Sequence, residues 1–155
     1  MRVLLVVPTH GYSYANPYQV TFLSASDFPS GMAYLAAALK KAGHTVIACN
    51  PNNITTYSSA YDMVYDQISE KLKDKPDLIG LGGIATDYTF IRDAIQIIRK
   101  LDNNVPIVLG GGIVTHDAEF IFNLLKPDFA IIGEAEETLV QLVNMLDKGE
   151  ESYEE

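Results

Sequence analysis

Short apolar runs alternate along this chain with longer segments of helical periodicity. The runs are apolar at nearly every position, which is typical of strands buried on both faces of a parallel sheet. The expected strands are residues 3–7, 45–49, 78–82, 107–110 and 129–132. The expected helices are residues 31–41, about 59–73, 87–100, 116–125 and 136–147. This alternation predicts a doubly wound, Rossmann-like α/β domain, with helices on both faces of a five-stranded parallel sheet and the flavodoxin-like strand order 2-1-3-4-5.

Length and charge limit the classes of function. A chain of 155 residues with 48% hydrophobic content fits one domain with a full core. Residues 1–75 hold 6 Lys and Arg against 5 Asp and Glu, whereas residues 76–155 hold 5 against 15. Because an acidic surface repels phosphate backbones and anionic lipid, we expect no nucleic acid or membrane partner.

A single cysteine and a short apolar N-terminus indicate a cytoplasmic protein. Because Cys49 is the single cysteine, the chain can form neither an internal disulfide nor a cysteine cluster for a metal. We expect Cys49 to be a small buried residue at a strand end. The first apolar run ends at Pro8, too early for a secretory signal, and no run approaches the length of a membrane span.

Ligands of doubly wound sheets lie outside the carboxyl ends of the strands. The loops expected there are "PTHGY", "GGIATD", "GGGIVTHD" and "GEAEET". Their glycines can let a large, flat or elongated ligand approach the main chain, or they can serve close packing of strands and helices. The dinucleotide fingerprint, the Walker A motif, the acidic residues of a receiver domain and the Ser/Thr-rich flavodoxin loop are all missing. We therefore expect a bulky ligand that is not held chiefly by its phosphate, and binding rather than catalysis.

The polar residues of these loops are only weak candidates for a metal or catalytic site. His10 lies at the ligand edge and can contact a metal or hydrogen-bond within its own loop. His44 is expected to be a solvated turn residue, and Thr115 is expected to cap the helix that His116 and Asp117 open. Glu134 is a candidate polar contact at the ligand edge.

Two segments depart from the regular alternation. The connection between the first strand and the first helix is far longer than an ordinary βα loop and is rich in aromatic residues: Tyr12, Tyr14, Tyr18, Phe22 and Phe28. These rings can form a wall over a flat ligand, a surface for another domain, or a segment folded back on its own domain. The acidic tail, residues 149–155, is expected to be a linker after a domain of residues 1–148.

The ordered set of loops resembles a known family. The stretches "VLLVVPTHG", "PSGMAYLAAALKKAGHTV", "PDLIGLGGIATDYTFIRDAIQIIRK", "VPIVLGGGIVTHDAEFIF" and "PDFAIIGEAEETLVQLV" are similar to the N-terminal cobalamin-binding domain of cobalamin-dependent radical S-adenosylmethionine proteins. That group includes methyltransferases and the anaerobic magnesium-protoporphyrin ester cyclase. The resemblance implies a cobalamin-binding module of a radical enzyme that performs methyl transfer or cyclisation.

The resemblance also implies where cobalamin binds. Its nucleotide tail is expected along one group of residues: Gly82, Gly83, Ala85 and Thr86. The tail and ring are expected to approach a second group: Gly110, Gly111, Gly112 and Ile113. The corrin edge is expected to be bordered by Gly133, Glu134 and Glu136, and the first loop is expected to contribute Thr9, His10 and Gly11. S-adenosylmethionine and a [4Fe-4S] cluster are implied only for a catalytic domain outside this chain, either downstream or separate, since no Cys-x-x-x-Cys-x-x-Cys occurs here.

One departure from related cobalamin domains concerns the lower cobalt ligand. Domains with a histidine lower ligand carry Asp-x-His-x-x-Gly after the first strand, whereas residues 8–13 read "PTHGYS" and lack the aspartate and the final glycine. Because a ligating imidazole needs an acceptor on its other nitrogen, we expect no strong ligation by His10. Two alternatives stay open: a cofactor-free docking domain, and one half of a nucleotide-sugar transferase.

Overall fold

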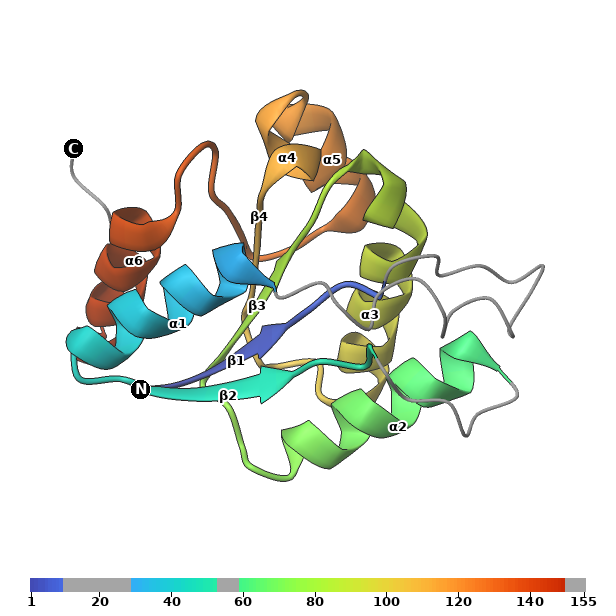
Figure 1. The fold of residues 1–155 in the computed structure, drawn as a ribbon, viewed down its shortest axis with the longest axis horizontal. Coiled ribbons are helices and arrows are strands. Elements are labelled where there is room, and N and C mark those ends of the chain that lie inside the picture. Colours follow the sequence, from blue (N-terminus) through green and yellow to red (C-terminus); the bar gives the residue numbers. More distant parts are fainter. Residues whose placement is uncertain (10–28, 53–58, 150–155) are drawn as a thin grey trace.

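The computed structural model describes residues 1–9, 29–52 and 59–149 and contains one parallel sheet (Figure 1). Its strands are β1 (Arg2–Val6), β2 (Thr45–Cys49), β3 (Leu78–Gly82), β4 (Ile107–Gly110) and β5 (Phe129–Ala130). Their order is β2-β1-β3-β4-β5, and every neighbouring pair is parallel. The predicted α/β class, strand number and strand order are confirmed.

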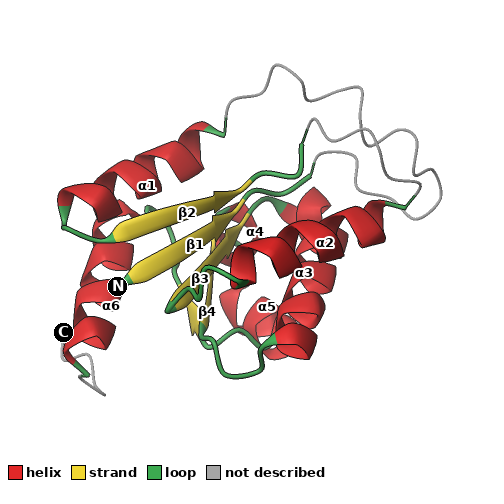
Figure 2. Cartoon of the chain, turned by 90° about the horizontal axis from the view of Figure 1, so that it is seen from below, coloured by secondary structure: helices red, strands yellow, loops and turns green. Residues whose placement is uncertain are grey.

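Helices cover both faces of the sheet, as predicted. The helices are α1 (Ser30–Lys41), α2 (Ala60–Leu72), α3 (Tyr88–Leu101), α4 (Gly112–Thr115), α5 (Ala118–Leu125) and α6 (Glu136–Lys148), and a 3₁₀ turn, η2 (Ala85–Asp87), precedes α3. Figure 2 shows α1 and α6 on one side of the strands and α2, α3 and α5 on the other. The chain therefore forms three layers.

Strand alternation divides the core into two halves. In β1, Val3 and Leu5 belong to the apolar cluster beneath α1 and α6, while Leu4 and Val6 belong to the cluster beneath α2 and α3. All four side chains are at most 2% exposed. Because successive side chains of a strand point to opposite faces, a strand between two helical layers must be apolar throughout.

Two expectations about the helix before β5 and about His44 are wrong. Asp117, not Thr115, caps α5, since its carboxylate accepts a hydrogen bond from the Phe120 N–H. The Thr115 hydroxyl instead donates to the Gly111 carbonyl at 3.2 Å, because a short helix, α4, intervenes. His44 is buried rather than solvated: its Nε2 lies 3.0 Å from Asn144 Oδ1 of α6.

The amino end of the sheet is held by a short motif that occurs twice. Lys75-Pro76-Asp77 precedes β3, and Lys126-Pro127-Asp128 precedes β5. Both lysines have φ of +52°, and each aspartate accepts the N–H of a residue that opens the neighbouring strand. Asp77 Oδ2 lies 2.6 Å from Arg2 N, and Asp128 Oδ2 lies 2.6 Å from Ile107 N.

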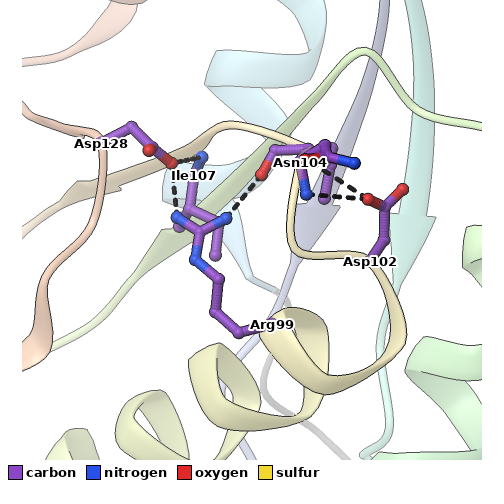
Figure 3. Close-up of polar contacts among 6 residues, drawn as sticks. Arg99, Asp102, Asn104, Ile107 and Asp128 are labelled. Carbon is purple, nitrogen blue, oxygen red and sulfur yellow. Dashed lines mark hydrogen bonds and ion pairs between the residues drawn. The ribbon is translucent and has the colours of Figure 1, made fainter.

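Arg99 completes the second copy of this motif (Figure 3). Its guanidinium donates to Asp128 Oδ2 at 2.5 Å and to the Val105 carbonyl at 2.7 Å, so that it ties the end of α3 to the starts of β4 and β5. Asp102 accepts the N–H groups of Asn104 and Val105 in the same loop. This network lies at the opposite edge from the loops of the expected ligand site.

Cys49 is 1% exposed at the end of β2, as predicted. Burial raises the pKa of its thiol to about 11. In the part of the chain that the structure describes, no helix combines the length and apolar character needed to cross a membrane.

Candidate functional site

A pocket of about 330 Å³ opens at the carboxyl edge of the sheet. It lies between the start of α1, the start of α6 and the ends of β1, β3 and β4. Seven of the fourteen expected site residues line it: Gly82, Gly83, Gly110, Gly111, Gly133, Glu134 and Glu136. The structure therefore brings together residues from three loops that are separated by up to about fifty positions in the sequence.

The floor of the pocket is bare backbone because the last residues of two neighbouring strands are glycines. Gly82 ends β3 and Gly110 ends β4, and the two are paired in register. Chain neighbours aside, the heavy atom nearest to a Cβ on Gly110 would be the Ile131 carbonyl oxygen, at 3.8 Å. The missing side chain of Gly110 therefore leaves open space. A Cβ on Gly82 would lie 3.2 Å from the Gly110 carbonyl oxygen and 3.5 Å from Met32 Cε, so this glycine also allows close packing.

One wall of the pocket is the first turn of α1. Gly31, Met32 and Leu35 line it, and a Cβ on Gly31 would meet no atom within 4 Å. A glycine inside a helix destabilises it by about 1 kcal/mol relative to alanine. Sequence analysis expected Gly31 only to start the helix, because the open space beside it is a property of the tertiary structure.

Other lining residues were also missed by sequence analysis. They are the apolar ends of β1 and β3 and the residues that flank the starts of α1 and α6: Val7, Pro8, Pro29, Leu81 and Ala135. Nothing in their pattern distinguishes them from ordinary core and loop residues. Their contribution follows only from the tertiary arrangement.

Gly111 is required by the protein itself. Its φ of +84° lies in the left-handed region, and a Cβ there would lie 2.8 Å from the Gly83 carbonyl oxygen and 3.0 Å from Gly83 N. The loop after β3 therefore packs backbone to backbone against the loop after β4. In addition, the Ile113 N–H donates to the Gly83 carbonyl at 3.0 Å.

The other expected residues that the structure describes are not among those that line the pocket. Ala85 and Thr86 are exposed on the turn η2, Gly112 begins α4, and Ile113 is 5% exposed and belongs to the core cluster on the α3 side. Thr9 is 1% exposed, and its hydroxyl has no hydrogen-bond partner among the described residues. His10, Gly11 and the aromatic residues of the first loop lie outside the described residues.

The charged groups that line the pocket are acidic. Glu134 precedes α6 and Glu136 is its first residue, where a carboxylate complements the helix dipole. No Lys or Arg is among the described lining residues. The pocket therefore suits an apolar group bordered by hydrogen-bond donors better than a free phosphate.

The B12 binding domain model matches residues 27–143, which covers most of the chain, including all of α1 and the first part of α6. The chain belongs to the B12 binding domain family. This match confirms the family that the sequence resemblance indicated.

Curated relatives of this B12 binding domain are much longer proteins. It is 28% identical over 154 residues to the anaerobic magnesium-protoporphyrin IX monomethyl ester cyclase of Rubrivivax gelatinosus, covering 96% of this chain and 25% of the relative. It is 30% identical over 149 residues to the protein of the same name from Cereibacter sphaeroides, covering 92% of this chain and 22% of the relative. The chain thus spans about a quarter of the length of these curated relatives.

The fold is shared with a solved radical S-adenosylmethionine methyltransferase, TsrM from Kitasatospora setae. The structure with tryptophan and an S-adenosylmethionine analogue matches with a TM-score of 0.71 at 20% identity, covering 97% of this chain and 26% of that one. A second structure of the same enzyme, with cobalamin and a [4Fe-4S] cluster bound, matches with a TM-score of 0.67 at 19% identity. The B12 binding domain described here thus has the architecture of one quarter of that enzyme.

Proposed function

We propose that this chain is the cobalamin-binding module of a radical S-adenosylmethionine enzyme that performs methyl transfer or cyclisation. The observation that carries the proposal is the glycine-floored pocket at the carboxyl edge of the sheet. Family membership supports cobalamin as the ligand, and the length of the relatives supports a separate catalytic domain. When bound, cobalamin supplies a cobalt centre that can carry a methyl group or assist a radical step.

The pocket residues fit part of a cobalamin molecule. Open space at Gly31, Gly110 and Gly133 lets a bulky group lie against the main chain, since a Cβ at these positions would meet at most the Ile131 carbonyl oxygen within 4 Å. Glu134 and Glu136 are hydrogen-bond acceptors for the amide N–H groups on the rim of a corrin. A pocket of about 330 Å³ is too small for the whole cofactor, so the rest of it would lie outside against Ala85, Thr86 and a partner surface.

The proposal extends to the domain organisation. Residues 1–148 form the binding domain, residues 149–155 lead toward the catalytic domain, and that domain holds S-adenosylmethionine and the [4Fe-4S] cluster. The lower face of cobalt is proposed to lack strong ligation by His10, because the residues around it do not complete the Asp-x-His-x-x-Gly motif. If so, the absorbance spectrum of bound hydroxocobalamin is unchanged in His10→Ala, whereas a shift of its visible bands shows that this imidazole does ligate cobalt.

The main experiment is an absorbance titration of the chain with hydroxocobalamin, followed by gel filtration. Stoichiometric retention is expected for the wild type. Gly110→Leu and Gly31→Leu should lose it while keeping a cooperative thermal transition, because each side chain grows into the pocket from a position where a Cβ is sterically accepted. Asn104→Leu is the matched control, since Asn104 is exposed in the loop at the opposite edge of the sheet.

Three outcomes would contradict this proposal. If the wild type retains no cobalamin, either alone or with its catalytic domain, the cofactor-free docking domain becomes the better interpretation. If cobalamin is retained equally by all four proteins, the chain binds it at another place. Binding of a nucleotide sugar without cobalamin would instead favour the transferase alternative.

A further inference from the structure

Residues outside the pocket hold the three loops that line it through hydrogen bonds, one within a loop and the others between loops. The first of these residues is Asp87, which is 9% exposed and lies behind the loop that follows β3. Its Oδ2 accepts the Ile84 N–H at 2.9 Å. This is the backward contact that an acid at the third position of a helical turn makes with the N–H at the start of that turn.

Asp87 also packs directly on the pocket lining. A Cβ on Gly83 would lie 2.6 Å from the Asp87 carboxylate, so the carboxylate occupies the space where a side chain would be. On its other side, Gly83 meets Gly111, and its carbonyl accepts the Ile113 N–H. Gly83 is therefore held between Asp87 and the loop that follows β4.

Thr115 continues the connection to the loop that follows β5. Its hydroxyl donates to the Gly111 carbonyl at 3.2 Å and accepts the Gly133 N–H at 3.5 Å. Gly83, Gly111 and Gly133 all line the pocket, whereas Asp87 and Thr115 do not. The Thr115 side chain thus links the loops after β4 and β5. The Ile113 N–H links the loops after β3 and β4, and Asp87 holds the loop after β3 from within.

We propose that Asp87 and Thr115 are positioning residues that hold the three loops as one preformed pocket wall. The proposal rests on the proposed function for its ligand, cobalamin. Preforming a binding site raises affinity because the loops lose little freedom when the ligand binds. Asp87 should have the larger effect on cobalamin affinity, since its hydrogen bond is charge-assisted and buried, while the Thr115 contact to Gly133 is long.

The wall itself is tested first, in the ligand-free chain, by amide hydrogen exchange followed by NMR. In Asp87→Ala, exchange at Ile84 should accelerate at least about tenfold, the factor for a hydrogen bond to a charged group. Exchange at Ile113 should also accelerate, because its acceptor, the Gly83 carbonyl, is no longer held by Asp87. Exchange at Ile79, whose N–H donates to the Pro106 carbonyl at the other end of β3, should not change. Asp87→Asn should restore protection, because its amide oxygen can accept the same hydrogen bond.

Thr115 is tested in the same way with two variants, one that removes the hydroxyl at nearly the same size and one that keeps it. Thr115→Val removes the hydroxyl and should accelerate exchange at Gly133, while Thr115→Ser should leave it near the wild-type rate. Unchanged exchange at Ile113 in Asp87→Ala, or at Gly133 in Thr115→Val, would overturn the claim that the loops form one unit.

Hydroxocobalamin binding then tests the positioning role. Asp87→Ala should weaken binding about tenfold and Thr115→Val about threefold, with Asp87→Asn and Thr115→Ser close to the wild type. Faster exchange without any loss of affinity would overturn the positioning role and leave a purely structural one. If the wild type binds no cobalamin, the proposed function fails, whereas the exchange measurements still decide whether the loops form one unit.

Discussion

Gly111 and Gly83 touch through their main chains, at a distance that excludes any side chain on Gly111. A Cβ there would lie 2.8 Å from the Gly83 carbonyl oxygen, and the φ of Gly111 is +84°. The neighbouring Gly110 is different, since its missing side chain leaves space in the pocket. Two of the three consecutive glycines therefore lack a side chain for different reasons. Gly111 allows close packing of backbone within the protein, and Gly110 leaves space in the pocket.

We expect Gly111→Ala to lower the free energy of unfolding by about 2–4 kcal/mol, because it combines left-handed strain with a clash against backbone. Gly110→Ala should change it by less than about 1 kcal/mol, since the new methyl group is sterically accepted and alanine restricts the unfolded chain. Urea denaturation of both variants measures the difference. Equal destabilisation would show that the two loops do not pack as closely as described.

The alternation of buried strands and amphipathic helices was sufficient to predict the layers and strand order. The strand limits were accurate where the apolar run was bounded by a turn signal, as at Leu78 and Gly82. The short helix α4 was not predicted, because four residues, Gly112–Thr115, are too few to show a helical period. That omission also misplaced the cap of the next helix, from Asp117 to Thr115.

The candidate site was predictable only in part, and the reason is geometric. Glycines at strand ends were visible in the sequence because loops after parallel strands meet at one edge. The wall at Gly31 and the support by Asp87 were not, since both depend on which surface of α1 and η2 faces the loops. The buried environment of His44 was missed for a similar reason: its partner, Asn144, is one hundred residues away.

The repeated Lys-Pro-Asp motif supports the sheet at its amino end, and its two copies should contribute unequally. Ile107 is fully buried, so Asp128→Ala leaves its N–H without an acceptor and removes one partner of Arg99. We expect a loss of about 2 kcal/mol in the free energy of unfolding. In Asp77→Ala the loss should be smaller, because Arg2 is exposed and water can replace the carboxylate.

Glu70→Ala is the control for those two variants, since the Glu70 side chain is exposed and forms an ion pair with Lys73. Its urea midpoint should not differ measurably from that of the wild type. A smaller effect for Asp128→Ala than for Asp77→Ala would contradict the dependence on burial.

Lys126 offers a stabilising substitution. It ends α5 with φ of +52° and ψ of +52°, a left-handed conformation that costs a residue with a side chain about 1–2 kcal/mol. Lys126→Gly removes this cost but adds freedom to the unfolded chain, so we expect a net gain of about 0.5 kcal/mol. A rise in the thermal midpoint tests it, with Lys148→Gly, at the last residue of α6, as a control that should lower the midpoint.

Cys49 should make the stability of the chain fall at alkaline pH. Its thiol is buried, and its pKa is raised to about 11, above the ordinary value of 9.0. Below pH 9 the thiol is protonated in both the folded and the unfolded chain, so stability is unaffected. Between about pH 9 and 11 only the unfolded chain loses this proton, which favours unfolding by up to about 2 kcal/mol. Comparing urea denaturation of the wild type and Cys49→Ala from pH 8 to 11 isolates this contribution, because all other ionisable groups are common to both. The free energy difference between the two proteins should shrink as the pH rises. A constant difference would show that the folded and unfolded thiols ionise alike, and a rapid reaction of the native thiol with iodoacetamide at pH 8 would contradict its burial.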